Sequence, residues 1–177
     1  AVENASNMYW ISEQDALYDL KGGIVLMNDI TIDSGVEPWI PIAVDGNFNL
    51  DGRGHTLTLS LDFGDEVSSD YQALFSIFNY GVIKDLYLAG DVRGCTTSHT
   101  GGLAGAMYRT AVTKVISYAD VTNTCTTGGY AGGIAGYYGG KHADGLYSKL
   151  TNCAVYADVT GYIAGGFIGQ GWNGTQY

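Results

Sequence analysis

The chain has 177 residues, of which 46% are apolar and only 15% charged, and its formal net charge is −10. Its eight Lys and Arg residues form no basic run, so nucleic acids and anionic membrane surfaces are not expected partners. No apolar run reaches the roughly 18 residues of a membrane-spanning helix, and no signal peptide is visible. We expect one domain that follows a removed signal or is a piece of a larger polypeptide.

Residues 1–23 predict a tail and a short helix. Residues 1–7 carry no pattern, whereas Ser12 and Asp15 have the spacing of a capping box, in which each side chain binds the other residue's backbone N–H group. Apolar residues then follow at helical spacing until Gly22 and Gly23. We therefore predict a helix over residues 13–20 that closes the amino-terminal end of a β domain spanning residues 24–177.

Residues 24–61 predict strands. Apolar and β-branched residues dominate residues 24–27 and 30–32, and Pro41 places residues 39–42 near an edge or corner. Residues 56–61 alternate apolar and polar side chains, which is typical of a strand with one buried face.

From residue 72 onward the sequence repeats. The motif Gly-Gly-Leu-Ala-Gly at residues 101–105 returns in similar form at 132–136 and 165–169, and a fainter copy lies at 72–76. A period of about 30 residues is the mark of stacked repeats. We expect the central apolar residues Leu103, Ile134 and Phe167 to lie one above another in a shared core column.

A second motif follows the glycine motif. Three apolar stretches that end in Asp-Val align without gaps at residues 83–92, 112–121 and 150–159. The last interval is longer because residues 141–148 form an insertion. Helical repeats need long segments with few glycines, but this chain has 27 Gly and short apolar runs between turn residues. The pattern predicts an all-β fold, a β-solenoid with coils about 4.8 Å apart.

The two motifs together resemble the GLUG repeat. That repeat occurs in large bacterial surface proteins and in the amino-terminal region of IgA-protease-type metallopeptidases. Residues 39–42 and 48–57 look like the segment that commonly precedes such repeats, so the resemblance covers roughly residues 24–175. It implies a right-handed parallel β-solenoid. It is specific for architecture and says little about function.

The register has a consequence for the cysteines. Cys95 and Cys125 are separated by about one coil, so their Cα atoms should come within reach of a disulfide. Two free thiols in a loop are the alternative. Cys153 falls in the lane of Leu86 and Val115, and we expect it to be a buried free thiol.

Three acids occupy one lane. Asp91, Asp120 and Asp158 would lie about 5 Å apart on successive coils, where like charges repel. Either a cation such as Ca²⁺ lies between some of them, or each carboxylate accepts hydrogen bonds from the backbone of its own turn. Hydrogen bonding is the simpler interpretation.

Exposed aromatic side chains indicate binding, since Tyr and Trp stack on sugars or anchor protein partners. We predict Tyr137, Tyr138 and Trp172 as ligand-binding residues, and we expect Tyr118 and Tyr156 to form a stacked ladder rather than a binding site. Packing over neighbouring coils is the alternative for at least half of the turn aromatics. These are Tyr71, Tyr80, Tyr130, Tyr137, Tyr138, Tyr147, Tyr162 and Trp172.

No pattern for catalysis is visible. His55, His99 and His142 share no metal-ligand spacing, and no His-Glu-x-x-His motif or phosphate-binding loop is present. We expect no catalytic residues and no cofactor other than the Ca²⁺ considered above. A polysaccharide-active solenoid enzyme would need acids with Lys or Arg on neighbouring coils, whereas Lys84 and Lys114 look isolated.

The sequence therefore predicts a non-enzymatic segment of a bacterial surface or secreted adhesin-like protein, located outside the cell. It would present loops to a host or matrix protein or glycan and would be joined to further domains. A carbohydrate-binding or polysaccharide-processing module, or an accessory domain of a secreted peptidase, is the alternative. The last coil lacks its following strand, so we expect the polypeptide to continue, a partner to cover this end, or an aromatic tail to fray.

Overall fold

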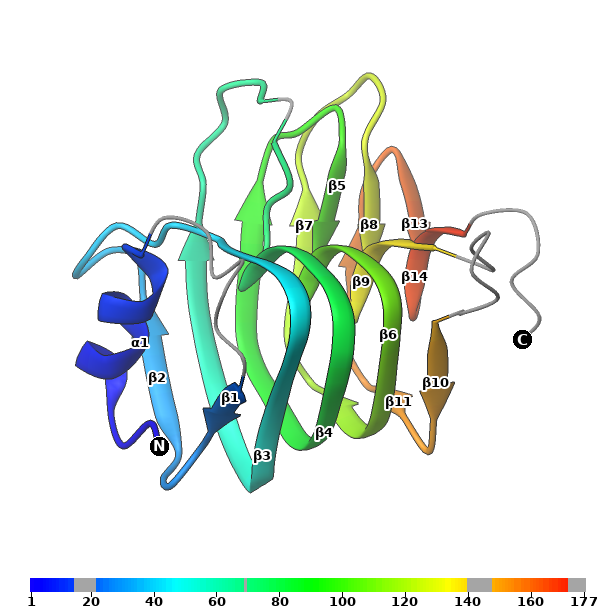
Figure 1. Ribbon diagram of the computed structural model, residues 1–177. Helices are drawn as coiled ribbons and strands as arrows, with labels where there is room; N and C mark the ends of the chain where they lie inside the picture. Colours follow the sequence, from blue (N-terminus) through cyan, green and yellow to red (C-terminus); the bar gives the residue numbers. More distant parts are fainter. Residues whose placement is uncertain (15–21, 69, 140–147, 172–177) are drawn as a thin grey trace.

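The computed structural model describes residues 1–14, 22–68, 70–139 and 148–171. This part of the chain forms a parallel β-solenoid of about four turns with one short helix at its amino-terminal end (Figure 1). Eleven strands make a sheet that winds around the core, and three more make a second, smaller sheet. The predicted all-β solenoid is confirmed, and its right-handed sense stays a prediction.

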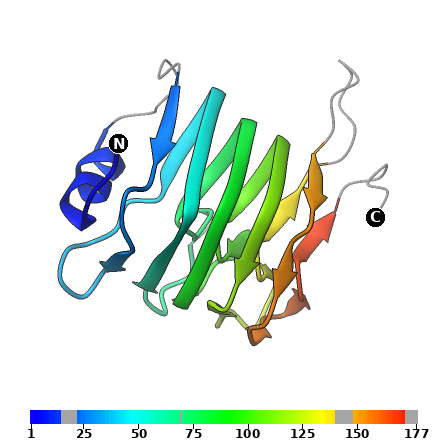
Figure 2. The same cartoon turned by 90° about the horizontal axis from the view of Figure 1, so that it is seen from below.

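Most strands recur at the same place in successive coils (Figure 2). The helix is α1 (Ala5–Ser12), and the amino-terminal coil contains β1 (Gly22–Val25) and β2 (Ile30–Asp33). Both strands pair with the long, bent β3 (Ile42–Asp62) of the next coil. The following strands are β4 (Phe75–Gly94), β5 (His99–Gly101), β6 (Ala104–Ser117), β7 (Asp120–Asn123), β8 (Tyr130–Gly132) and β9 (Ala135–Tyr138). The last are β10 (Lys149–Thr151), β11 (Ala154–Val155), β12 (Val159–Thr160), β13 (Ile163–Gly165) and β14 (Ile168–Gly171).

The pairing register follows the sequence repeat. Val92 of β4 pairs with Val121 of β7, and Val121 pairs with Val159 of β12. The strands that precede these valines pair with the same separations along the chain. Ile83 of β4 pairs with Val112 of β6, and Val112 pairs with Leu150 of β10. The gapless alignment of the three Asp-Val stretches in sequence is thus also their alignment in space. Residues 141–147 of the predicted insertion lie outside the described residues.

The predicted core column is present. The N–H of Leu103 donates to the carbonyl of Ile134 at 2.9 Å, and the N–H of Ile134 donates to that of Phe167 at 3.0 Å. Leu103 and Ile134 are fully buried, together with Leu74 one coil earlier, but Phe167 is 40% exposed. Phe167 belongs to the last described coil, so it is packed from one side only.

The glycines of the repeated motif allow a sharp corner. A Cβ atom on Gly101, Gly132 or Gly165 would overlap the carbonyl oxygen of the residue three positions later. Each first glycine therefore lets the chain turn back closely over itself, from the small sheet into the large one.

The helix α1 lies before the segment for which the sequence predicts one. The side chain of Asn4 accepts a hydrogen bond from the N–H of Asn7 and so caps α1. Ser12, the predicted cap, is instead the last helical residue, and its hydroxyl donates to the carbonyl of Tyr9 at 2.7 Å. Residues 1–7 are therefore only partly a tail, and the predicted helix over residues 13–20 lies mostly outside the described residues.

The helix covers one end of the solenoid, as expected. The hydroxyl of Tyr9 donates to the carbonyl of Asp33 at 2.8 Å and accepts from the N–H of the same residue at 2.9 Å. The Tyr9 ring also meets Trp39 edge-on, with ring centroids 5.7 Å apart. One side chain thus satisfies two backbone groups of β2, which lies at the open edge of the sheet.

Candidate functional site

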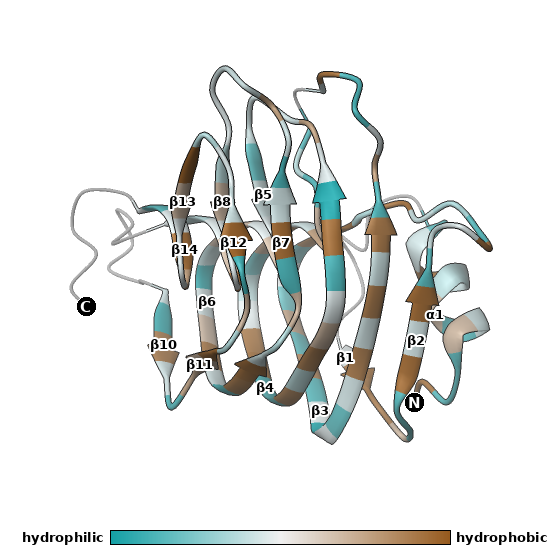
Figure 3. Ribbon diagram, turned by 180° about the vertical axis from the view of Figure 1, so that it is seen from behind, coloured by the Kyte–Doolittle hydropathy of each residue, from teal (hydrophilic) through white to brown (hydrophobic). Residues whose placement is uncertain are grey.

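The outer side of one solenoid wall carries polar and aromatic side chains in regular lanes. Along β4, Leu88 and Val92 point into the core and are fully buried, whereas Tyr87 and Asp91 point outward. Apolar and polar bands alternate along the long strands (Figure 3), as expected where successive side chains point to opposite faces. Stacked coils place these outward residues next to one another.

Two exposed tyrosines stack on this wall. The rings of Tyr118 and Tyr156 lie 5.5 Å apart with 20° between their planes, although the two residues belong to different coils. Their side chains remain 50% and 66% exposed. The backbone holds them in place, because Tyr118 donates to the carbonyl of Leu88 and Tyr156 to that of Ser117, both at 2.8 Å. The predicted tyrosine ladder is present.

The surface beside Tyr118 is open. Leu88 pairs with Ser117, so Ala89 is the neighbour of Tyr118 in the preceding coil. A methyl group covers little of an aromatic ring, in agreement with the 50% exposure of the Tyr118 side chain. Stacking on a ring face is how tyrosine binds flat apolar surfaces, including those of sugars.

The lane of acids runs beside these rings, two residues further along the chain in each coil. Asp91 pairs with Asp120 in register, and all three predicted acids are exposed. An oxygen of the Asp120 carboxylate accepts a hydrogen bond from the N–H of Asp158 at 2.8 Å. The backbone donor for Asp120 therefore comes from the next coil, whereas the sequence predicted a donor from the acid's own turn. We call Tyr118, Tyr156, Asp91, Asp120 and Asp158 the tyrosine–aspartate face.

The Ca²⁺ site on these acids stays a prediction. Within the described parts of the chain, no group of three or more His, Cys, Asp or Glu side chains is placed to hold a metal ion. Carboxylates also accept hydrogen bonds from hydroxyl groups, so the acids of the tyrosine–aspartate face can contact a ligand without a cation.

Tyr138, predicted as a ligand-binding residue, is buried in the core. Tyr138 is only 2% exposed, and its hydroxyl donates to the carbonyl of Thr110 at 3.4 Å. It occupies the inward lane of Phe78 and Met107, because Tyr137 and Tyr138 are consecutive in β9 and must point to opposite sides. Tyr137 is half-buried, and Trp172 lies outside the described residues.

A second aromatic cluster was only partly visible in the sequence. His99 lies between Tyr71 and Tyr130, with ring centroids 5.7 Å and 4.9 Å away, and Tyr137 meets it edge-on. Its Nε2 atom is 2.8 Å from the side-chain oxygen of Gln170, and burial lowers its pKa. Both ring faces of His99 are covered, so this column holds coils together and presents no free platform.

The phenol groups beside this column are also shielded from water. Burial is the main cause that raises the pKa of Tyr108 and of Tyr137, and the neighbouring Tyr71 raises both further. Tyr71 and Tyr130 were recognisable in the sequence as turn aromatics. Nothing there showed that they enclose His99.

The cysteines lie as the register requires. Cys95 and Cys125 form a disulfide with Cα atoms 4.7 Å apart, between the loops that precede β5 and β8. Cys153 is a free thiol that is half-buried rather than buried, because it belongs to the last described coil and no further coil covers it within the described residues. Its sulfur lies 3.4 Å from the carbonyl oxygen of Thr151.

Comparison with known proteins gives a fold relative. No protein-family model matches the sequence. No curated protein matches it. A crystal structure described as that of a "putative immunoglobulin A1 protease" from Bacteroides ovatus is similar, with a TM-score of 0.59 and 20% sequence identity over 97% of this chain. At this identity the likeness shows the fold alone, and it gives no support for the GLUG repeat.

The chain spans 61% of the length of that solved structure. In the described residues no helix is both long enough and apolar enough to cross a membrane.

Proposed function

We propose that this chain is a non-enzymatic, adhesin-like binding module of a secreted or surface-attached bacterial protein, and that its tyrosine–aspartate face binds a glycan. The observation that carries this proposal is the exposed stack of Tyr118 and Tyr156 beside a lane of carboxylates. Aromatic rings supply stacking surface for sugar rings, and carboxylates accept hydrogen bonds from sugar hydroxyls.

The composition and the disulfide support an extracellular setting. Charged residues make up only 15% of the chain, and Cys95 and Cys125 are joined across two coils. Disulfides persist in secreted and surface proteins and are rare in reducing compartments.

A glycan array tests the proposal. We expect the wild-type chain to bind at least one class of glycan, and Tyr118→Ala/Tyr156→Ala to bind it about tenfold more weakly, since each stacking contact contributes about 0.5–1.5 kcal/mol. Tyr162→Ala is the matched control, because Tyr162 is 62% exposed and lies outside the face. Equal binding by the double variant and the wild type would refute the assigned face.

A second candidate is an accessory module of a secreted peptidase. The fold similarity to the Bacteroides ovatus protein favours it, because that protein is described as a protease and extends beyond the region that this chain matches. The full-length reading frame tests this candidate. A downstream His-Glu-x-x-His motif would support it, whereas a cell-wall anchor without any peptidase domain would favour the adhesin-like module.

A further inference from the structure

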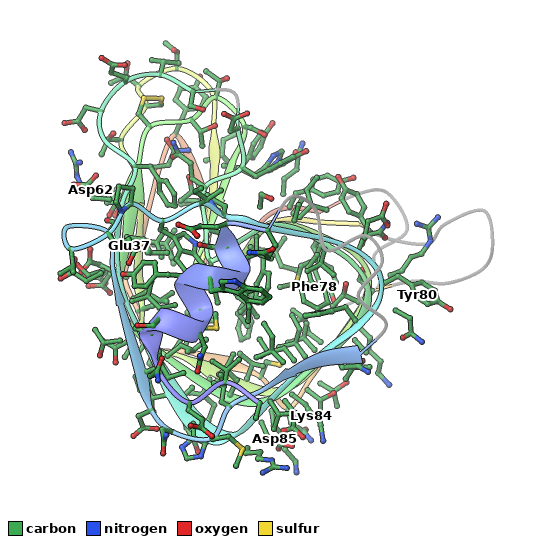
Figure 4. All side chains as sticks on the ribbon, turned by 60° about the vertical axis from the view of Figure 1, so that its left-hand side comes forward. Glu37, Asp62, Phe78, Tyr80, Lys84 and Asp85 are labelled. Carbon is green, nitrogen blue, oxygen red and sulfur yellow. A yellow bond between two sulfur atoms is a disulfide. The ribbon has the colours of Figure 1, made fainter. Side chains whose placement is uncertain are left out.

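An open groove runs along one outer corner of the solenoid. It has a volume of about 680 Å³ and crosses several coils. Charged side chains and one tyrosine make up most of its lining: Asp51, Arg53, Lys84, Asp85, Tyr87 and Lys114. Figure 4, which looks towards the helix-covered end, shows Lys84 and Asp85 outside this corner, while Phe78 points into the core.

The backbone at this corner repeats from coil to coil. Arg53, Asp85 and Lys114 have φ angles of 52°, 51° and 53°, in the left-handed region that side chains other than glycine rarely adopt. Asp85 and Lys114 occupy equivalent places in β4 and β6, because the residues on either side of them are paired in register. The turn therefore directs a side chain outward at the same place in each coil.

The groove gathers cations in an acidic chain. It contains three of the eight Lys and Arg residues in the sequence, whose formal net charge is −10. Lys84 pairs with Asp51 at 2.9 Å and Lys114 with Asp85 at 3.5 Å. Arg53 then leaves a formal surplus of one positive charge in the groove.

The two lysines stay accessible despite these pairs. The side chain of Lys84 is 46% exposed and that of Lys114 is 64% exposed. An ammonium group has three donors, so each lysine can bind a further anion while it keeps its aspartate partner. Surface pairs of this kind contribute little to stability, so the groove is not needed to hold the fold.

The groove is continuous with the tyrosine–aspartate face. Tyr87 and Ile116 line the groove, and Ile116 lies two residues before Tyr118 on the same side of the wall. Two residues of a strand span about 7 Å. A chain of sugars that stacks on Tyr118 and Tyr156 would therefore extend into the groove.

We propose that the groove binds the negatively charged groups of an acidic glycan, either carboxylates or sulfates, whose sugar rings lie on Tyr118 and Tyr156. This inference rests on the proposed function. The acids of the face do not oppose it, because six residues of extended chain, about 20 Å, separate Lys114 in β6 from Asp120 at the start of β7, and the Debye length at physiological salt is about 8 Å. Anionic groups thus lie at the corner and neutral hydroxyls lie toward the acid lane.

Two matched pairs of polysaccharides test the proposal. Polygalacturonate and its methyl ester differ only in carboxylate charge, and dextran sulfate and dextran differ only in sulfate. Titration calorimetry compares the wild type, Lys84→Gln/Lys114→Gln and the control Lys149→Gln, which removes an exposed charge that does not line the groove. Thermal unfolding of each variant checks that the fold is intact.

We expect the wild type to bind one charged polymer at least tenfold more tightly than its neutral partner, with affinity that falls as salt is added. The double lysine variant should lose roughly tenfold in affinity for the charged polymer and none for the neutral one. Lys149→Gln should bind as the wild type does. The charged polymer that binds more tightly shows whether the groove recognises carboxylates or sulfates.

Other results would overturn the proposal. Equal binding of charged and neutral polymers that also depends on Tyr118 and Tyr156 would refute the charged groove and leave glycan binding in place. Tight binding of polyglutamate, a polyanion without sugars, would show that the groove does not select glycans. Failure of all four polysaccharides to bind would contradict both the groove and the proposed function.

Discussion

Replacing Leu103 by alanine should destabilise the protein strongly. Leu103 is fully buried, and its neighbours in the column, Leu74 and Ile134, are fully buried as well. Backbone hydrogen bonds fix all three coils at this point, so the walls cannot close on the cavity. Leucine-to-alanine changes in such cores cost about 2–5 kcal/mol, and a site that cannot relax lies in the upper half of that range. We expect a loss of about 4 kcal/mol for Leu103→Ala.

Phe167→Ala is the matched comparison. Phe167 occupies the same column but is 40% exposed. Its larger side chain should still cost less to remove, about 1–2 kcal/mol, because it is only partly enclosed and water can fill the space that it leaves. Urea unfolding followed by tryptophan fluorescence measures both values, and unchanged m values would show that the unfolding reaction is the same. Equal losses, or a larger loss for Phe167→Ala, would refute the packing described for this column.

Three further predictions concern the disulfide, the buried histidine and the helix. Cys95→Ser/Cys125→Ser opens a loop closed across a sequence separation of 30 and should lower the free energy of unfolding by about 3–4 kcal/mol in urea titration. Burial lowers the pKa of His99 in the folded state, so the unfolded state binds a proton more readily, and stability should fall as the pH drops below the ordinary histidine pKa of about 6.5. His99→Phe should remove that part of the pH dependence in thermal melts, and an unchanged profile would contradict the assignment. Tyr9→Phe removes both hydrogen bonds to Asp33 and should cost about 1–2 kcal/mol, with the largest rise in amide exchange in β2.

The repeat made the coil register predictable. Each coil reuses the same small and apolar residues at the same places, so the alignment of Val92, Val121 and Val159 in sequence became their pairing in space. The same reasoning placed Cys95 opposite Cys125 and Tyr118 beside Tyr156. A local repeat of this kind carries long-range information that single strands lack.

The amino-terminal helix was harder to locate, because its sequence pattern is weak. Ser12 and Asp15 have the spacing of a capping box, yet the hydroxyl of Ser12 bonds back into the preceding turn. The helix is fixed instead by tertiary contacts of Tyr9 with Asp33 and Trp39, which sequence periodicity does not encode.

The charged groove could not be seen in the sequence for a similar reason. Lys84 and Lys114 looked isolated because each has different neighbours along the chain. Their shared corner arises from left-handed backbone conformations at Asp85 and Lys114, positions with no common residue type. The prediction of Tyr138 as a ligand-binding residue was wrong for a simpler reason. Alignment of the repeats places Tyr138 in the same lane as Phe78 and Met107, which point into the core.

Disulfide trapping across the acid lane tests the stacking of coils most directly, since the tyrosine–aspartate face and the groove both depend on it. In a Cys153→Ser background, Asp91→Cys/Asp120→Cys places two thiols at paired positions of adjacent coils, about 4.8 Å apart. Asp91→Cys/Asp158→Cys places them two coils apart, about 10 Å, which is beyond disulfide reach. Under mild oxidation, mass spectrometry should find an engineered disulfide in the first variant only. Cross-linking of the second variant instead of the first, or of both equally, would contradict the register on which the account rests.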